Sequence, residues 1–189
     1  MTRRRSIEKR PTLVGVAILA FALLAAGCGR APDERSPAAQ GTIRAENAKE
    51  APLLPTLADE LPAMGPDTFG RLLEQLKGTP VLVNFWGSWC PPCKDEMPRL
   101  VAAHADFGDR VQFIGVDILE SRDEARAFMR DYHMTFPSVF DPPDEIKGSL
   151  GQFGQPTTIF YEADGKFEFA WGGPISESML RKHLAAIAG

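Results

Sequence analysis

Cysteine and histidine are scarce in this chain, which contains only 3 of each in 189 residues. Two of the cysteines form a single Cys-x-x-Cys pair, Cys90 and Cys93, and the third, Cys28, lies far upstream. A structural zinc site needs a second Cys or His pair at ligand spacing, and the histidines stand singly along the chain. The sequence therefore argues against a zinc site at this pair, and we expect neither a bound metal nor a cofactor.

Positive charge is also lacking over most of the chain. Residues 1–10 carry a net charge of +4 and the whole chain carries −4, so residues 11–189 carry −8. An acidic domain offers no electrostatic footprint for nucleic acid, so we expect no nucleic-acid partner. The contents of hydrophobic residues (44%) and charged residues (24%) are ordinary for a globular protein.

The N-terminal segment contains a stretch without any charge. No charged residue occurs between Pro11 and Cys28, and the run from Leu13 to Ala26 is continuously apolar. A basic start followed by a short apolar run is typical of a secretory signal. The run is shorter than the ~20 residues of a membrane-spanning helix, although an uncleaved anchor is an alternative.

The apolar run ends in Leu24-Ala25-Ala26-Gly27-Cys28, which resembles a bacterial lipobox. We therefore expect residues 1–28 to be a lipoprotein leader, with Cys28 lipidated and attached to a membrane. Acylation would also remove an unpaired thiol that would be a liability in an exported protein. The alternatives are that Cys28 leaves with a cleaved signal or stays within an uncleaved anchor.

The rest of the chain divides into two parts. Residues 29–53 are rich in Pro, Ala, Arg and Glu and have no apolar periodicity, which predicts a flexible tether. Residues 54–189 contain the alternating apolar segments of a folded domain and are long enough to bury a core.

The Cys-x-x-Cys pair follows a predicted strand. Residues 80–86 are apolar, rich in Val and Phe, and bounded by glycines, and a polar run with helical spacing follows Cys93. This order predicts that Cys90 lies at the start of a helix, where the free N–H groups of the first turn stabilise a thiolate. Cys93 lies one turn further along the same side and can resolve a mixed disulfide formed at Cys90.

The residues between the cysteines affect the redox behaviour of the pair. Pro91 suits the first helical position, and Pro92 removes a second amide that could have donated to the Cys90 sulfur. Neither residue adds a cation. We therefore expect moderate stabilisation of the thiolate and a reducing rather than strongly oxidising dithiol.

The remaining segments predict an alternation of helices and strands. We expect a short edge strand or irregular element within 54–65, and a helix capped by Asp67. A capping box at Ser121-x-x-Glu124 predicts another helix, and Ser176 can cap the last one. The other predicted elements are strands at 111–116 and 136–140, a short helix within 142–150, and a hairpin of 157–161 and 166–171 with an Asp-Gly turn.

The segment WGSWCPPCKDEMP resembles the active site of the TlpA/ResA-like branch of the thioredoxin superfamily, which comprises membrane-tethered thiol-disulfide oxidoreductases. The trailing Glu96-Met97-Pro98 points to this branch, and the resemblance covers about residues 54–189. It implies an α/β thioredoxin-like fold, in which helices flank a central mixed β-sheet. It also implies a helix-strand insertion before a cis-proline, which agrees with the elements expected between residues 116 and 156.

The resemblance also assigns roles to individual residues. It implies that Pro156 is the cis-proline facing the dithiol and that Gln155 faces the substrate. Trp89 is expected to cover the surface beside Cys90. Asn84 occupies the position of the buried Asp of thioredoxin and cannot take a proton, so Glu96 is the candidate proton acceptor for Cys93. For an arbitrary helix, a solvated carboxylate would be the simpler interpretation of such a Glu.

The resemblance implies an extracytoplasmic enzyme that reduces disulfides in exported proteins, with apocytochrome c as one possible client. Its expected partners are disulfide-bearing exported proteins and a membrane thiol reductant of the CcdA/DsbD kind. One alternative is an oxidase that donates its disulfide to secreted proteins, and another is a membrane-tethered binding module with incidental redox activity. A peroxidase is disfavoured, because Gly87 stands where a Thr or Ser is expected three residues before the attacking cysteine.

Overall fold

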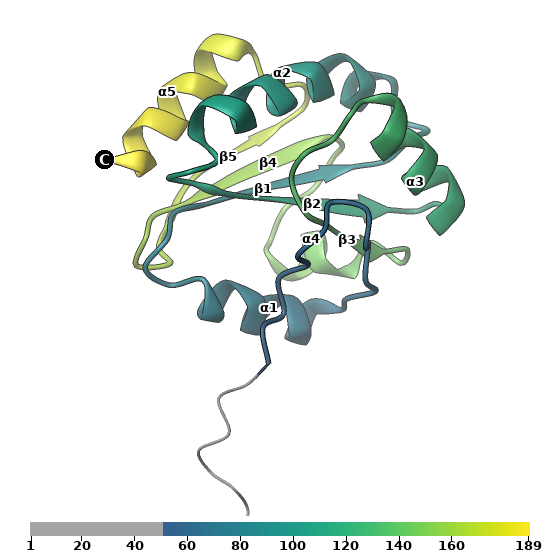
Figure 1. Cartoon of the computed structure of the whole chain (residues 1–189), viewed down its shortest axis with the longest axis horizontal. Coiled ribbons are helices and arrows are strands. Elements are labelled where there is room, and N and C mark those ends of the chain that lie inside the picture. Colours follow the sequence, from purple (N-terminus) through teal and green to yellow (C-terminus); the bar gives the residue numbers. More distant parts are fainter. Residues whose placement is uncertain (1–50) are drawn as a thin grey trace, which may run out of the picture. The chain divides into compact units, whose positions relative to one another are not determined.

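A five-stranded sheet forms the centre of the part of the chain that the structure describes (Figure 1). The structure is a computed structural model, and it describes residues 51–189. The leader, the lipobox with Cys28 and most of the predicted tether lie outside the described residues. The helices are α1 (Pro66–Gln75), α2 (Pro91–Phe107), α3 (Arg122–Asp131), α4 (Glu145–Ser149) and α5 (Glu177–Ala188), and the strands are β1 (Val81–Trp86), β2 (Gln112–Ile118), β3 (Ser138–Asp141), β4 (Thr157–Tyr161) and β5 (Phe167–Gly172).

The sheet is mixed, as expected, with the strand order β3-β2-β1-β4-β5. Strand β1 pairs in parallel with β2, and β2 in parallel with β3, whereas β4 runs antiparallel to both β1 and β5. Strand β1 is therefore central and buried along its whole length. Its C-terminal residue, Trp86, leads directly into the loop that carries the cysteines.

Helices cover both faces of the sheet (Figure 1). Helices α2, α3 and α5 pack on one face over a core that includes Trp86, Leu100, Phe113 and Leu184. Helices α1 and α4 pack on the other face. This division follows the alternation of side chains along β1, because successive residues of a strand point to opposite faces.

The expected insertion is present before Pro156. Helix α3, strand β3 and helix α4 lie between β2 and β4, and α3 opens with the predicted capping box. Ser121 Oγ accepts from the Glu124 amide, and the Glu124 carboxylate accepts from the Ser121 amide. Strand β3 extends the sheet beyond β2 and so forms one of its two edges.

One local expectation is corrected. The N-cap of α1 is Gly65, with Pro66 in the first turn, so Asp67 lies inside the helix. The fixed φ of proline favours the first helical position, which explains the earlier start. Of the two alternatives expected for residues 54–65, the irregular element is the one observed, with an isolated bridge between Ala63 and Phe140 of β3.

Among residues 51–189, no helix combines the length and apolar character needed to cross a membrane.

Candidate active site

The cysteine pair lies where β1 ends and α2 begins. Cys90 is the N-cap of α2, and its Sγ accepts a hydrogen bond from the Cys93 amide at 3.3 Å. Pro91 and Pro92 carry no N–H, so the Cys93 amide is the first of the helix that can donate to this sulfur. The two cysteines form a disulfide, with their Cα atoms 5.3 Å apart. The helix N-terminus is therefore positioned to stabilise negative charge on Cys90 once the disulfide opens.

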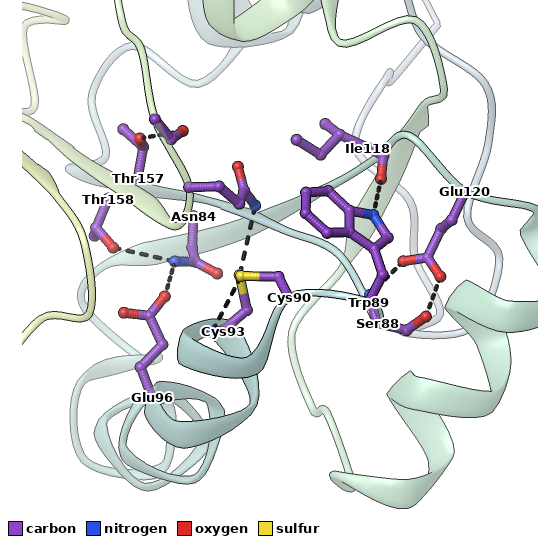
Figure 2. Close-up of a disulfide and its surroundings, with 12 residues drawn as sticks. Asn84, Ser88, Trp89, Cys90, Cys93, Glu96, Ile118, Glu120, Thr157 and Thr158 are labelled. Carbon is purple, nitrogen blue, oxygen red and sulfur yellow. Dashed lines mark hydrogen bonds between the residues drawn. A yellow bond between two sulfur atoms is a disulfide. The ribbon is translucent and has the colours of Figure 1, made fainter.

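The pair is nearly covered in this disulfide form. Cys90 is 2% exposed and Cys93 is fully buried, whereas Trp89 is 48% exposed. The indole Nε1 of Trp89 donates to the Ile118 carbonyl at 3.2 Å, which holds the ring beside the pair (Figure 2). A partner that reacts with Cys90 must therefore move some of the surrounding side chains.

An open groove lies next to the pair, with a volume of about 420 Å³. Its walls are formed by separate segments of the chain, which include Trp89, Leu119, Phe153 and Gln155. Leu119 and Phe153 are 53% and 83% exposed. An exposed apolar rim of this kind suits an extended polypeptide better than a small polar solute.

The segment before β4 also reaches the disulfide, and its Gln155 lines the same groove as Trp89. The Gln155–Pro156 peptide bond is cis, as the resemblance implied. The side-chain Nε2 of Gln155 donates to Cys93 Sγ at 3.6 Å. Gln155 thus both lines the groove and contacts Cys93.

Glu96 lies one turn beyond Cys93 and is completely buried. Its Oε1 accepts from Asn84 Nδ2 at 2.8 Å, and its Oε2 accepts from the Ile175 amide at 2.9 Å. Asn84 also donates to Thr158 Oγ1 at 3.1 Å, so one amide links β1, α2 and β4 (Figure 2). Burial raises the pKa of Glu96 to about 7, although both hydrogen bonds and the charge of Arg99 act to lower it.

A second buried carboxyl, Asp117, lies near the C-terminal end of β2. Burial, followed by a hydrogen bond and repulsion from Glu120, raises the pKa of Asp117 to about 9. Glu120 in turn accepts hydrogen bonds from both the amide and the hydroxyl of Ser88, in the loop before Cys90 (Figure 2). The loop that carries the cysteines is therefore fixed to the end of β2 at two points, Ser88 and Trp89.

The fold brings together every predicted site residue that the structure describes. Trp89 and Gln155 lie beside the cysteines, Pro156 follows Gln155 through the cis bond, and Glu96 lies beneath them, whereas Cys28 is outside the described residues. Sequence reasoning did not identify Lys147, Asp117 or Glu120 as parts of this region. Only Asp117 left a signal, as a lone carboxylate in an otherwise apolar strand.

Among the described residues, no group of three or more His, Cys, Asp and Glu side chains has the arrangement of a metal site. The chemistry that this arrangement supports is the opening and closing of the Cys90–Cys93 disulfide beside a peptide-sized groove.

Comparisons with known proteins agree with this chemistry. The model of the AhpC/TSA family matches residues 68–170. The thiol-disulfide oxidoreductase ResA of Bacillus subtilis is 33% identical over 124 residues, which cover 64% of this chain and 69% of ResA. The ResA protein of Geobacillus thermodenitrificans is 29% identical over 116 residues, covering 61% of this chain and 67% of its own length.

Solved structures show the same thioredoxin-like architecture. A secreted disulfide oxidoreductase of Mycobacterium tuberculosis, described as homologous to DsbE of E. coli, superposes with a TM-score of 0.56 at 28% identity, covering 60% of this chain and 85% of its own. A secreted thiol-disulfide isomerase of Corynebacterium glutamicum superposes with a TM-score of 0.57 at 25% identity, covering 61% and 74%.

Proposed function

Since the chain belongs to the AhpC/TSA family and is a thiol-disulfide oxidoreductase, we propose that it works outside the cytoplasm and reduces disulfides in exported proteins. The observation that carries this proposal is the hydrogen bonding of Cys90. Its sulfur accepts from the Cys93 amide, and the two prolines withhold two further amides at the helix start. Because few amide hydrogen bonds stabilise the Cys90 thiolate, the Cys90–Cys93 pair should have a reducing potential.

The proposed reaction takes two steps. The Cys90 thiolate attacks a sulfur of the client's disulfide, forms a mixed disulfide, and releases the client's other sulfur as a thiolate that takes up a proton. Cys93 then loses its proton and attacks Cys90 Sγ, which closes the Cys90–Cys93 bond and releases the second client sulfur. Glu96 accepts the Cys93 proton, and Gln155 and Pro156 hold the client's backbone beside the sulfurs.

The surroundings of the pair support a polypeptide client. The groove beside the disulfide has an exposed apolar rim formed by Trp89, Leu119 and Phe153. Apocytochrome c, whose haem-binding thiols must be reduced before haem attaches, is one proposed client. Each turnover leaves the enzyme oxidised, so a membrane thiol reductant of the CcdA/DsbD kind must return two electrons.

The proposed location rests on the N-terminal sequence and on the relatives. Both solved relatives described above are named as secreted proteins. We propose that residues 1–28 direct export, that a lipid on Cys28 anchors the chain, and that residues 29–53 let Cys90 reach its partners. Labelling with a radioactive fatty acid tests the anchor: the label should enter the native chain and be absent from Cys28→Ser.

The central experiment traps the client. In Cys93→Ala the mixed disulfide at Cys90 cannot be resolved, so captured proteins can be released with reductant and identified. Exported proteins with paired cysteines should be captured, and the Cys90→Ala Cys93→Ala double variant should capture none. Capture of proteins without Cys90 would contradict the proposal. Survival of the biological activity in the double variant would also contradict it, because that result would indicate a scaffold rather than an enzyme.

Equilibration with glutathione tests the direction of the reaction. The proposal requires a reducing potential, near that of thioredoxin rather than that of a strong oxidase such as DsbA. An oxidising potential would assign the chain to disulfide donation.

A further inference from the structure

Among the described residues, Lys147 is the one Lys or Arg side chain that is buried, at 6% exposure. It belongs to α4, on the opposite side of the sheet from α2, but its Nζ reaches the segment before β4. There it lies 2.8 Å from Asp144 Oδ2 and donates to Gln155 Oε1 at 3.1 Å. Burying an ammonium group costs free energy unless it is paired, and Asp144 and Gln155 are the partners that compensate Lys147.

The Gln155 side chain connects this cation to the active site. Its amide oxygen accepts from Lys147 at 3.1 Å, and its amide nitrogen donates to Cys93 Sγ at 3.6 Å. A cation at the oxygen end polarises an amide and strengthens the N–H donor at the other end. It also fixes the orientation of the amide, because only the oxygen can accept from an ammonium group.

We propose that Lys147 acts through Gln155 to stabilise negative charge on the Cys93 sulfur. Gln155 touches the reacting atom, and Lys147 is a positioning residue that orients and polarises it. The inference rests on the thiol-disulfide exchange of the proposed function, but not on its direction or on the identity of the client.

Charge develops on Cys93 in both directions of the reaction. When a reductant thiolate attacks Cys90 Sγ, the Cys90–Cys93 bond breaks and its electron pair moves to Cys93 Sγ. When a mixed disulfide is resolved, the Cys93 thiolate donates that pair to Cys90 Sγ, and the client sulfur leaves with the electrons of the broken bond and takes a proton. A donor aimed at Cys93 Sγ therefore assists both recharging and resolution.

The test measures the charge on Cys93 directly. Cys28→Ser and Cys90→Ser are introduced together, so that Cys93 is the only thiol, and thiolate formation is followed by ultraviolet absorbance against pH. Lys147→Met removes the charge but keeps a long unbranched side chain, and we expect the pKa of Cys93 to rise by roughly one unit. Gln155→Leu should raise it similarly. Combining Lys147→Met with Gln155→Leu should raise the pKa of Cys93 no further than either change alone, because Lys147 acts on Cys93 only through Gln155.

A change of opposite sign separates this role from a structural one. Asp144 partly neutralises Lys147, so Asp144→Asn should lower the pKa of Cys93, whereas Lys147→Met raises it. General loosening of the site would move both variants in the same direction. Lys166→Met is the matched control, since Lys166 is exposed in the β4–β5 turn at the far end of the sheet.

The other ionisable groups beside the pair are the same in all of these variants. They are Lys94, Asp95 and Glu96 on α2, and Asp117 and Glu120 at the end of β2.

An unchanged pKa of Cys93 in Lys147→Met would overturn the inference, and so would additive effects of Lys147→Met and Gln155→Leu. If Lys147→Met does not fold, Gln155→Leu and Asp144→Asn still decide the matter by the sign of their shifts. The predicted shifts in the pKa of Cys93 hold whether the enzyme reduces or forms disulfides. Failure to trap clients would therefore contradict the proposed function but not the role of Lys147.

Discussion

The carboxylate of Glu96 and the amide of Asn84 are joined by a hydrogen bond of 2.8 Å in the buried core beneath the disulfide. Asn84 cannot exchange protons near neutral pH, but it can orient a group that does. The pKa of Glu96 is raised to about 7, chiefly by burial, so this carboxyl exchanges its proton in the physiological range. In the proposed mechanism this pair separates two tasks: Asn84 positions the carboxyl group of Glu96, and that carboxyl group holds or releases the proton.

Glu96→Gln should slow the resolution step by about 100-fold, at the lower end of the range for general bases, and should remove its pH dependence around pH 7. The change keeps the size of the side chain but removes the proton acceptor. Rapid mixing of a preformed Cys90 mixed disulfide, followed by the release of client thiol across the pH range, measures this step. Asp95→Asn, an equivalent change at the exposed neighbouring residue, should leave the profile intact. An unchanged profile in Glu96→Gln would make the residue structural.

Asp117→Asn should flatten the pH dependence of stability. The pKa of Asp117 is raised from 3.8 to about 9, chiefly by burial, so the folded state keeps a proton that the unfolded chain loses. The stability linked to this proton is complete below about pH 4 and is lost as the pH rises toward 9. One such group contributes a slope of at most about 1.4 kcal/mol per pH unit.

Urea unfolding at several pH values between about 5 and 9 measures this effect. As the pH rises, the free energy of unfolding of the native chain should fall more steeply than that of Asp117→Asn. The difference in stability between the two should therefore shift in favour of the variant at alkaline pH. Glu96, whose raised pKa acts with the same sign up to about pH 7, should still contribute a slope in the variant. Asp109→Asn, at an exposed position, is the control, and a variant curve parallel to the native one would refute the prediction.

Features set by a few neighbouring residues were predictable from the sequence. Cys90 begins α2 because two prolines follow it, and Ser121 begins α3 because Glu124 completes its capping box. The Asp164-Gly165 turn joins β4 to β5, with Gly165 at a φ of +85°. In each case the chemistry of a turn or cap decides the conformation locally.

Features that depend on distant pairing were not predictable. The edge beside β2 is occupied by β3, while the segment before α1 contributes only the Ala63 bridge, and either segment had the composition of an edge strand. Lys147 likewise carries no local signal, because its role depends on α4 lying against the segment that contains Gln155. Proximity of this kind is a property of the assembled fold rather than of any short pattern.

Gly115→Ala should destabilise the protein by about 1–3 kcal/mol. A Cβ at this central-strand position would collide with Ser138 Oγ and would lie 2.7 Å from Trp86 Nε1. Both neighbours are buried, so neither can move away without disturbing the core. Gly70→Ala is the matched control: a Cβ there meets nothing within 4 Å, and alanine in an exposed helix position should stabilise by about 0.5–1 kcal/mol. Equal urea midpoints for the two variants would contradict this account of the packing.

Glu120→Gln should both loosen the active-site loop and change the titration of Asp117. The two carboxylate oxygens of Glu120 accept from the Ser88 amide and hydroxyl, whereas glutamine offers only one acceptor oxygen. Amide hydrogen exchange at Ser88 should therefore become faster. Removing the charge of Glu120 also removes one of the causes that hold the pKa of Asp117 high, so that pKa should fall by roughly one unit while burial keeps it above the ordinary value.

Carbon-13 NMR of the Asp117 carboxyl group measures this titration directly, and exchange at Ser88 can be followed on the same samples. Asp123→Asn is the control, because it removes an exposed carboxylate in the first turn of α3, whereas the amide and hydroxyl of Ser88 donate to Glu120. If the pKa of Asp117 fell equally in Asp123→Asn, the effect would be a general change in charge rather than a contact between two carboxyls. If exchange at Ser88 quickened without any change at Asp117, Glu120 would hold the loop independently of the buried proton.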